Sequence, residues 1–345
     1  MRNFSKILLL WVLDVLGINA LCGILNRKRA IILFYHGICD DDFDLLKGYN
    51  ERHISKSSFK KQLGYLKRKG YVFVNMTELI DALKNKGKIE KYVVLTFDDG
   101  FRNVVENAYP IMQEFNAKGC FYLVSDLIGT NQLLWTDYVE TVIRNQQQED
   151  FQFIFRGGKF NYKLGDKRAS EYAMLDIKTK LRKIPDKERL EHLRQFSNHE
   201  LDNIPKEFLM ASWEQIKKLD SQILEIGSHT RSHPNCENLI SDDELEREIN
   251  SSKIDIEKNI GREILHFCYP AGSYNDRVIA NVKKSGYKSA VTVRDGFSDE
   301  NSDLYQLKRI GVSENFLFFK AYISGSYNMI RRIKAALGLG SERGY

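Results

Sequence analysis

Cysteine is scarce in this sequence, and no two cysteines have a metal-binding or redox spacing. The five residues are an odd number and form no Cys-x-x-Cys pair. This usage favours a thiol-reducing compartment and predicts a cytoplasmic protein, whereas an exported protein with free thiols stays open as the alternative. The sequence also lacks an internal repeat and a low-complexity segment, which argues against a repeat architecture.

A dense block of lysine and arginine with interleaved aromatic residues is absent as well. The net charge of +6 over 345 residues permits weak attraction to anionic surfaces but gives no sign of a nucleic-acid-binding protein. What the sequence does contain is 43% hydrophobic and 12% aromatic residues, which is ample for a folded core. The length allows two ordinary domains or one large α/β barrel with insertions.

Neither end of the chain has an uninterrupted apolar segment of membrane-spanning length. Residues 7–25 are apolar except for Asp14 and Asn19, and no small-residue cleavage site follows them. A central aspartate costs about 2.5–3.5 kcal/mol in a spanning helix. For residues 1–29 we therefore favour a helix on a membrane surface or packed on the domain, with a poor membrane anchor as the third interpretation.

The C-terminal segment 326–345 is basic and amphipathic over residues 329–337, which supports a peripheral membrane contact on the cytoplasmic face. A solvated terminal helix explains this pattern equally well. We expect a cytoplasmic protein that is associated with a membrane through its terminal helices.

Strand and helix patterns alternate between these ends. Apolar runs at residues 30–35, 71–74, 92–95 and 119–124 are separated by helical spacings, and the rhythm resumes from 213 to 312. About seven parallel strands in a distorted (β/α) barrel over residues 30–325 are expected. Residues 131–210 interrupt the rhythm and predict a mainly helical insertion with a hairpin near 151–159, whose charged residues we expect at a solvated surface.

Two adjacent carboxylates close one of these strands. Residues 96–100, Thr-Phe-Asp-Asp-Gly, follow the apolar run 92–95. Successive strand residues point to opposite sides, so Asp98 and Asp99 can receive different environments and roles. Considered alone, the segment is better explained as an ordinary Asp-Asp-Gly turn.

Two further segments close other strands. His229 and His233 are four residues apart after the run 224–227, a spacing at which both imidazoles can bind one metal, although paired surface histidines also occur by chance. Tyr269-Pro270-Ala271-Gly272 closes the run 264–269, where a turn can direct a backbone N–H at a ligand or form an ordinary loop. Active sites of parallel α/β folds assemble at such strand ends. Two histidines with one carboxylate form a standard open metal set.

These three segments, in this order, resemble the signature of polysaccharide deacetylases, the carbohydrate esterase family 4 enzymes with a NodB homology domain. The resemblance extends over residues 30–312. It implies a (β/α) barrel of around seven strands and metal-dependent removal of N-acetyl groups from an amino-sugar polymer. Asp98 would be the general base. The ligands of a divalent metal, usually zinc, would be Asp99, His229 and His233. The oxyanion would be stabilised by the metal and the backbone N–H of Tyr269, with Pro270 and Gly272 shaping the turn.

The sequence departs from the common family pattern at the general acid. Many relatives have a late Leu-x-His motif, but no histidine follows His266 here. Other relatives have a Tyr-His motif on the first strand, which residues 35–37 match, so we assign His36 as the acid; a structural histidine is the alternative. The arginine that usually orients the base is also missing, and Arg309 is our hypothesis for its replacement. We expect His266 in the core. At the surface we expect His53, His192 and His199.

The expected partner is an N-acetylated glycan, either a polysaccharide or its precursor, and not a nucleic acid. Two alternatives remain: a deacylase or amidohydrolase of a lipid-linked or small-molecule substrate, and a non-catalytic glycan-binding module. The sugar and the chain length do not follow from the residues.

Overall fold

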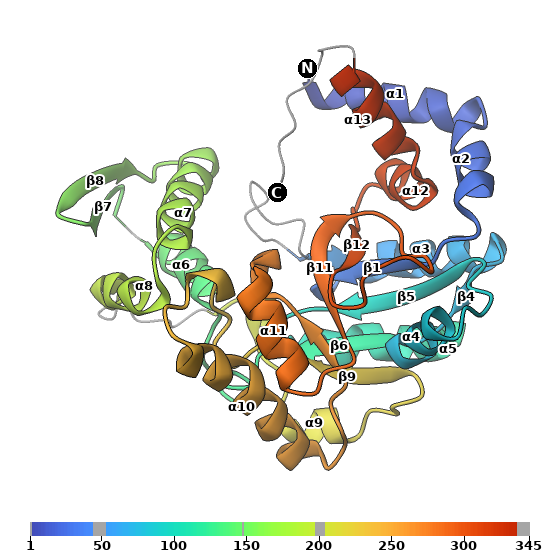
Figure 1. Ribbon diagram of the computed structural model, residues 1–345. Helices are drawn as coiled ribbons and strands as arrows, with labels where there is room; N and C mark the ends of the chain where they lie inside the picture. The colour runs from blue at the N-terminus through green and yellow to red at the C-terminus, as the bar shows by residue number, and fades with distance from the viewer. Residues whose placement is uncertain (1, 44–52, 147, 197–203, 337–345) are drawn as a thin grey trace.

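The computed structural model describes residues 2–43, 53–146, 148–196 and 204–336, and its centre is a closed barrel of seven parallel strands (Figure 1). β5 pairs back onto β1, with Ile31 opposite Val93 and Tyr35 opposite Phe97, which closes the ring. The barrel predicted from the alternation of strands and helices is therefore confirmed. Around the ring the strands are β1 (Ile31–Tyr35), β12 (Leu307–Gly311), β11 (Ser289–Asp295), β10 (His266–Cys268), β9 (Leu224–Ser228), β6 (Gly119–Leu123) and β5 (Tyr92–Phe97).

Helices and short strands surround this ring. β4 (Val72–Phe73) pairs with the beginning of β5, and β2 (Gly37–Cys39) pairs with β3 (His53–Ser55) beyond the end of β1. The helices are α3 (Lys56–Arg68), α4 (Met76–Lys84), α5 (Tyr109–Phe115), α9 (Trp213–Lys217), α10 (Asp242–Ile260), α11 (Asp276–Lys284) and α12 (Phe316–Ser324), with a π-helical turn at Val104–Ala108 and 3₁₀ turns at Lys206–Phe208, Cys236–Asn238 and Pro270–Gly272. Capping boxes begin three of them, at Asn75, Ser212 and Ser241.

Alternate residues of the strands contribute to two hydrophobic cores. Val94 of β5 clusters with Ile32 of β1, Leu307 of β12 and the apolar face of α4. Val93 and Leu95 belong to the other core, which includes the buried faces of α3 and α10. Because side chains alternate along a strand, Thr96 lies on the same side as Val94, and Arg309 on the same side as Leu307. This is the side on which polar residues gather towards the ends of the strands.

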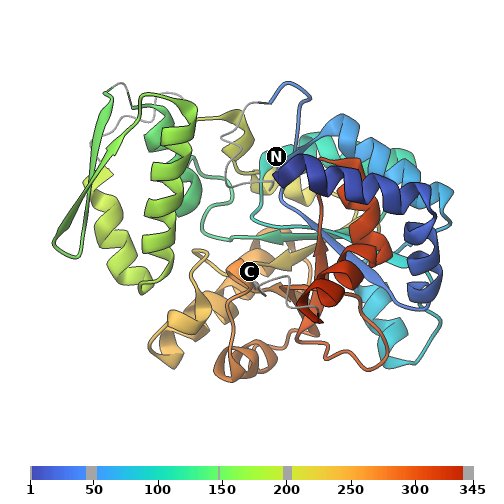
Figure 2. The same ribbon diagram turned by 90° about the horizontal axis from the view of Figure 1, so that it is seen from above.

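The insertion stands beside the barrel as a small layer of its own (Figures 1 and 2). It contains α6 (Trp135–Arg144), the antiparallel hairpin β7 (Asp150–Phe155) and β8 (Gly158–Lys163), α7 (Lys167–Arg182), α8 (Asp186–Leu193) and a 3₁₀ turn at Arg194–Phe196. Its side chains form a separate hydrophobic core centred on Phe153, Met174 and Ile177.

The expectation that the charged residues of the insertion are solvated is wrong for several of them. Lys178 and Glu140 are fully buried as an ion pair with an N–O distance of 3.2 Å. Arg189 is also buried, and its guanidinium lies 4.7 Å from the ring centre of Trp135. Burial next to an opposite charge or an aromatic face offsets the desolvation of such groups. These partners are distant in the chain and do not follow from the residue pattern.

The N-terminal segment forms two helices, whereas a single helix was expected. α1 (Arg2–Val15) and α2 (Ile18–Asn26) meet at Gly17, whose φ of 73° is left-handed and favours glycine. They pack against α12, and α2 also contacts α13 (Ser326–Ala336), so the two ends of the chain lie together (Figure 1). Among the described helices no single one has the length and hydropathy of a membrane span. Only α1 and α2 taken together, with a bend of 74° between them, have the required length and hydropathy.

Gly119 is expected to tolerate no side chain. A Cβ atom there would lie 2.1 Å from the carbonyl oxygen of Leu95 on the neighbouring strand. Because the backbone would have to move, Gly119→Ala should lower the free energy of unfolding by about 1–3 kcal/mol in urea denaturation. Gly23→Ala is the matched control, since Gly23 lies in α2 with open space around it. The control should be neutral or more stable by about 0.5–1 kcal/mol; equal unfolding of both variants would contradict this packing.

Candidate active site

The polar residues predicted for the site lie together at the carboxyl ends of the barrel strands. His36 follows β1, Asp98 and Asp99 follow β5, and His229 follows β9. The ends are tied together by backbone hydrogen bonds: the N–H of Asp98 donates to the carbonyl of Tyr35, and the N–H of His229 to that of Leu123. The barrel therefore places residues from distant parts of the chain at one end, where a parallel α/β fold forms its active site.

Asp99, His229 and His233 have the geometry of a metal-ligand set. One ligand atom from each lies within 4.8 Å of the others. The Nε2 atoms of both histidines are 3.5 Å from the same Oδ1 of Asp99, which is longer than a charge-assisted hydrogen bond. Two imidazole nitrogens and a carboxylate are ligands that suit zinc and leave coordination positions open. These residues fit a divalent metal.

The tautomer of His229 agrees with this assignment. Its Nδ1 is 2.8 Å from the carbonyl oxygen of Cys268, and because a carbonyl only accepts, Nδ1 bears the proton. Nε2 is then left with its lone pair directed towards Asp99. Burial lowers the pKa of His229 despite the nearby charge of Asp98, which favours the neutral imidazole that a metal requires.

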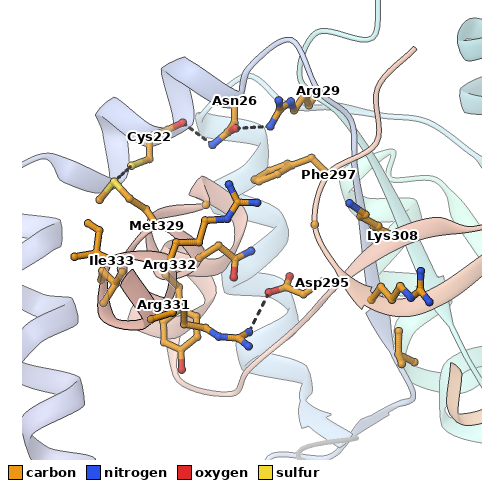
Figure 3. A pocket seen from close by; sticks show the side chains of 18 of the residues that line it. Cys22, Asn26, Arg29, Asp295, Phe297, Lys308, Met329, Arg331, Arg332 and Ile333 are labelled. Atoms are coloured by element: carbon orange, nitrogen blue, oxygen red, sulfur yellow. Dashed lines mark hydrogen bonds and ion pairs between the residues drawn. The ribbon is translucent and has the colours of Figure 1, made fainter. Parts of the chain in front are cut away.

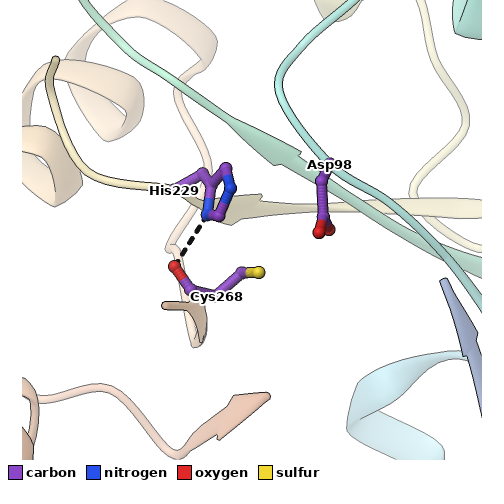
Figure 4. Close-up of side chains that lie close together, drawn as sticks. All are labelled: Asp98, His229 and Cys268. Atoms are coloured by element: carbon purple, nitrogen blue, oxygen red, sulfur yellow. Dashed lines mark hydrogen bonds between the residues drawn. The ribbon is translucent and has the colours of Figure 1, made fainter. Parts of the chain in front are cut away.

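A second set of close side chains, Asp98, His229 and Cys268, is shown in Figure 4. It is a poorer metal site, because a cysteine ligand must be a thiolate. Burial raises the pKa of the Cys268 thiol well above its usual value, and Asp98 is already engaged by Arg309. The set that contains Asp99 is therefore the better candidate for a metal site.

The backbone around the ligands is strained. Asp99, Thr230, His233 and Ala271 all have φ between 52° and 78°, in the left-handed region that residues with a Cβ atom avoid. They are four of the eight described non-glycine residues with positive φ, so half of them lie at this one end of the barrel. Such strain costs about 1–3 kcal/mol per residue and persists only where the surroundings hold it.

α10 holds the histidine segment in this conformation. A single carboxylate, that of Glu248, accepts from the backbone N–H groups of Arg231 and Ser232 at 3.0 and 2.9 Å and from the Ser232 hydroxyl at 2.9 Å. The Ser252 hydroxyl donates to the carbonyl of Thr230 at 3.0 Å. Neither residue was predicted, because nothing in the pattern of a surface helix distinguishes a glutamate that faces a loop from one that faces water.

Asp98 and Arg309 form a buried two-point ion pair. Nη1 and Nη2 of Arg309 lie 2.7 and 2.8 Å from the two carboxylate oxygens. Arg309 also donates to the Thr96 hydroxyl and to the carbonyl of Thr292. Burial raises the pKa of Asp98, but the charge and hydrogen bonds of Arg309 outweigh it and hold that pKa well below its usual range. Asp98 is therefore a carboxylate at neutral pH, and Arg309 occupies the orienting position hypothesised for it.

His36 is half-buried at the end of β1, beside Asp98 on the neighbouring strand. Burial, Arg309 and His229 have the larger effects on the pKa of Asp98. The positive charge of a protonated His36 also lowers that pKa, so the two side chains interact electrostatically. The chain continues directly into Gly37, where a Cβ atom would lie 2.4 Å from the ring of His53. His36 is therefore held by a segment that has no room to move towards β3.

The other histidines are not at the site. His53 was expected at the surface, and this is wrong: it is 3% exposed, its Nε2 is 3.2 Å from the carbonyl of Glu207, and it packs on Phe101. His192 is half-buried against Phe155, and His199 lies outside the described residues. His266 is in the core, as expected, bonded to Thr77 and Ser289, and burial lowers its pKa to about 3.

The Tyr-Pro-Ala-Gly turn differs from its predicted role in one respect. The Tyr269 ring is buried, its hydroxyl donates to the carbonyl of Tyr305, and its backbone N–H donates to the carbonyl of Val291 at 3.2 Å. This N–H is thus already used within the barrel, so to serve an oxyanion it would have to share or exchange that bond. Pro270 is buried, and Gly272 has φ +67° with no room for a Cβ atom, which would lie 2.3 Å from Val293.

Glu248→Gln should loosen the histidine segment without touching the ligands. Glutamine offers one acceptor oxygen where Glu248 offers two, and it lacks the charge that strengthens three hydrogen bonds. We expect zinc affinity, measured by competition with a chelator, to fall about 10–100-fold. Glu246→Gln is the control on the same helix, because Glu246 is exposed and pairs with Lys284. Unchanged affinity in Glu248→Gln would mean that the segment holds its own shape.

Comparison with known proteins agrees with this geometry. The family model described as polysaccharide deacetylase matches residues 85–290, more than half of the chain. The poly-β-1,6-N-acetyl-D-glucosamine N-deacetylase of Staphylococcus epidermidis is 22% identical over 299 residues, covering 84% of this chain and 81% of that relative.

Two solved structures share the fold. The Streptococcus pyogenes deacetylase PplD, in complex with acetate, has a TM-score of 0.55 and 21% identity, covering 83% of this chain and 93% of its own. IcaB from Ammonifex degensii has a TM-score of 0.55 and 18% identity, covering 86% and 97%. At these identities the structures show the fold, while the family match extends over the segments with the paired aspartates, the histidines and the Tyr-Pro turn. The chain belongs to the polysaccharide deacetylase family.

Proposed function

We propose that this protein is a metal-dependent N-deacetylase of an amino-sugar glycan. The proposal rests on one observation: the set of Asp99, His229 and His233 lies beside Asp98, a second carboxylate that Arg309 holds ionised. A glycan-binding module needs neither a metal set nor a separate charged base. The complete arrangement therefore argues against the non-catalytic alternative.

Zinc is the proposed metal, held by the Asp99 carboxylate and the Nε2 atoms of His229 and His233. When bound, such an ion polarises an amide carbonyl and lowers the pKa of a water molecule. Orientation of the ligands and proton transfer are carried out by the protein's own side chains. Nδ1–H of His229 keeps its bond to Cys268, so the ring stays oriented during the reaction.

Asp98 is the proposed general base. Arg309 fixes both carboxylate oxygens and keeps the group unprotonated, so that it is ready to accept a proton from the attacking water. Arg309 does not touch the substrate in this proposal; it is a positioning residue.

His36 is the proposed general acid that protonates the leaving amine. Its support is its place at the end of β1, next to Asp98, and its partial exposure. An acid and a base on neighbouring strand ends can act on the two sides of one amide bond. A purely structural histidine at this position is the competing interpretation.

The proposed substrate is an N-acetylated amino sugar within a polysaccharide or its precursor. It is supported by the family match and by relatives whose names specify poly-β-1,6-N-acetyl-D-glucosamine. A cytoplasmic location with membrane association is likewise a proposal; its support is that all five cysteines are buried free thiols.

Substitutions of the two neighbouring aspartates should have different effects on zinc content and activity. Asp99→Ala should lower zinc content, because it removes a ligand, and activity should be lost with the metal. Asp98→Asn should retain zinc but slow amine release by at least about 10²-fold, since an amide cannot accept the proton. The measurements are zinc content by mass spectrometry and free amine released from an N-acetylglucosamine oligomer.

Chelation of the wild type should abolish amine release, and added zinc should restore it. Because Asp98→Asn leaves a buried guanidinium without a charged partner, each variant is first checked for cooperative unfolding. Full turnover by the chelated enzyme, or by folded Asp98→Asn, would rule the mechanism out.

His36→Ala should lower the rate of amine release by about 10²–10⁴-fold and leave zinc content unchanged. The reason is that only proton transfer to the leaving group is removed. His192→Ala, a half-buried histidine in the insertion, is the control and should keep wild-type turnover. Loss of zinc together with activity in His36→Ala would identify a ligand or a structural residue instead of an acid.

A further inference from the structure

The N-terminal helices have their polar side chains turned inward. Asn19 is buried; it donates to Asp14 at 2.9 Å and accepts from the Ser326 hydroxyl at 2.6 Å. Asp14 also pairs with Lys320 of α12, and Asn26 donates to the carbonyl of Ser324. A helix on a water-soluble protein normally buries its apolar face and exposes its polar one. In α1 and α2 polar side chains are buried beside the apolar Leu10 and Cys22, which departs from that order.

Most of the large apolar side chains that α1 and α2 do not bury are strongly exposed. Leu16 and Leu25 are 69% and 73% exposed. Ten of the seventeen exposed large hydrophobic residues in the described chain belong to one part of it: nine lie on α1, α2 and α13, and Leu16 lies in the turn between α1 and α2. Together they form what we call the platform. Its members are Leu8, Leu9, Trp11, Val15, Leu16, Leu21, Ile24, Leu25, Met329 and Ile333. Such a concentration on one part of a surface marks a site of interaction, whereas single exposed residues need no explanation.

The charged side chains on the helices of the platform are mainly basic, although three of the cations beside it form ion pairs with acids of neighbouring segments: Arg27 with Glu90, Arg29 with Asp299 and Arg331 with Asp295. Asp14, the only acidic residue in α1, α2 and α13, is neutralised by Lys320. Exposed cations stand beside the apolar residues, namely Lys6, Arg331, Arg332 and Lys334, with residues 27–29 (Arg-Lys-Arg) after α2. Apolar residues that include an exposed tryptophan, bordered by lysine and arginine, are the composition of a surface that binds anionic lipid.

We propose that the platform docks on the surface of an anionic lipid bilayer. The 74° bend between α1 and α2 suits two helices that lie along a surface. A second copy of the chain is a poorer occupant, because its platform would bring a second set of cations against the first. Of the three interpretations of residues 7–25, this one also explains Asp14, which faces α12 and would not enter lipid.

A groove of about 1740 Å³ connects the platform with the active-site turn. One wall includes Leu9, Met329 and Ile333 of the platform, and the other includes Ala271 and Gly272 of the Tyr-Pro-Ala-Gly turn. Figure 3 shows the end of this groove near α2 and α13, where Arg331 pairs with Asp295. Docking would hold this groove beside the lipid headgroups, so a glycan at the membrane surface is the substrate that would enter it. Only this last step depends on the proposed function.

Vesicle co-sedimentation of the full chain tests the proposal. Wild type should bind vesicles of phosphatidylglycerol and phosphatidylcholine at least tenfold more tightly than vesicles of phosphatidylcholine alone, and salt should weaken the difference. Leu16→Ser/Ile24→Ser/Leu25→Ser should lower binding at least tenfold. The matched control, Leu190→Ser/Ile240→Ser/Ile254→Ser, changes equally exposed residues elsewhere and should bind like wild type.

Three results would overturn the proposal: no binding of wild type, equal binding of both triple variants, or retention of the protein in vesicles after alkaline carbonate, which indicates a span. A wild-type dimer that the platform variant dissociates, with no vesicle binding, would identify a second copy as the occupant. Turnover of a soluble oligomer is measured in parallel and should not differ between the two triple variants. Failure of docking is thereby distinguished from failure of deacetylation.

Discussion

The buried ion pair between Asp98 and Arg309 is the constraint on which the site depends. It joins β5 to β12, more than two hundred residues apart in the chain, and both side chains are almost completely removed from water. Either charge alone would be costly there, but two parallel hydrogen bonds and the contacts of Arg309 with Thr96 and Thr292 satisfy the pair. Because a bidentate pair has a fixed geometry, it sets the position of Asp98, and with it the end of β5.

That fixed strand end gives Asp99 its different role. A regular strand would alternate the two aspartates between opposite sides, but the left-handed φ of 78° at Asp99 turns the chain so that its carboxylate meets His229 and His233. The histidine segment reaches the same point through its own strained residues, held by Glu248 of α10. Two strained segments meet at one place. The histidine segment has one internal hydrogen bond, from the N–H of His233 to the Thr230 hydroxyl, and depends on Glu248 for the rest.

The sequence was sufficient for the barrel and for the meeting of Asp98, Asp99, His229 and His233, because the ends of parallel strands converge whatever their order in the chain. Arg309 was a hypothesis only because the sequence lacks the arginine that usually orients the base in this family. The sequence failed where burial depends on distant partners: His53 under Phe101, Lys178 with Glu140, and Glu248 against a loop. For the N-terminal segment it predicted one helix where the structure has two, and it left open which face would be covered, since hydropathy along a chain does not reveal the neighbour.

Arg309 has two opposing effects on Asp98, and together they connect the two halves of the site. By keeping the carboxylate ionised, Arg309 ensures that a proton can be accepted; by lowering its pKa, Arg309 makes Asp98 a weak base. A weak base removes a proton efficiently only from a strong acid, and ordinary water is not one. A divalent ion provides the required acidity by lowering the pKa of water. In the proposed mechanism the Asp98–Arg309 pair would therefore act in hydrolysis together with a cation, and Asp99, His229 and His233 are the set of described residues that fits one without using Asp98 itself.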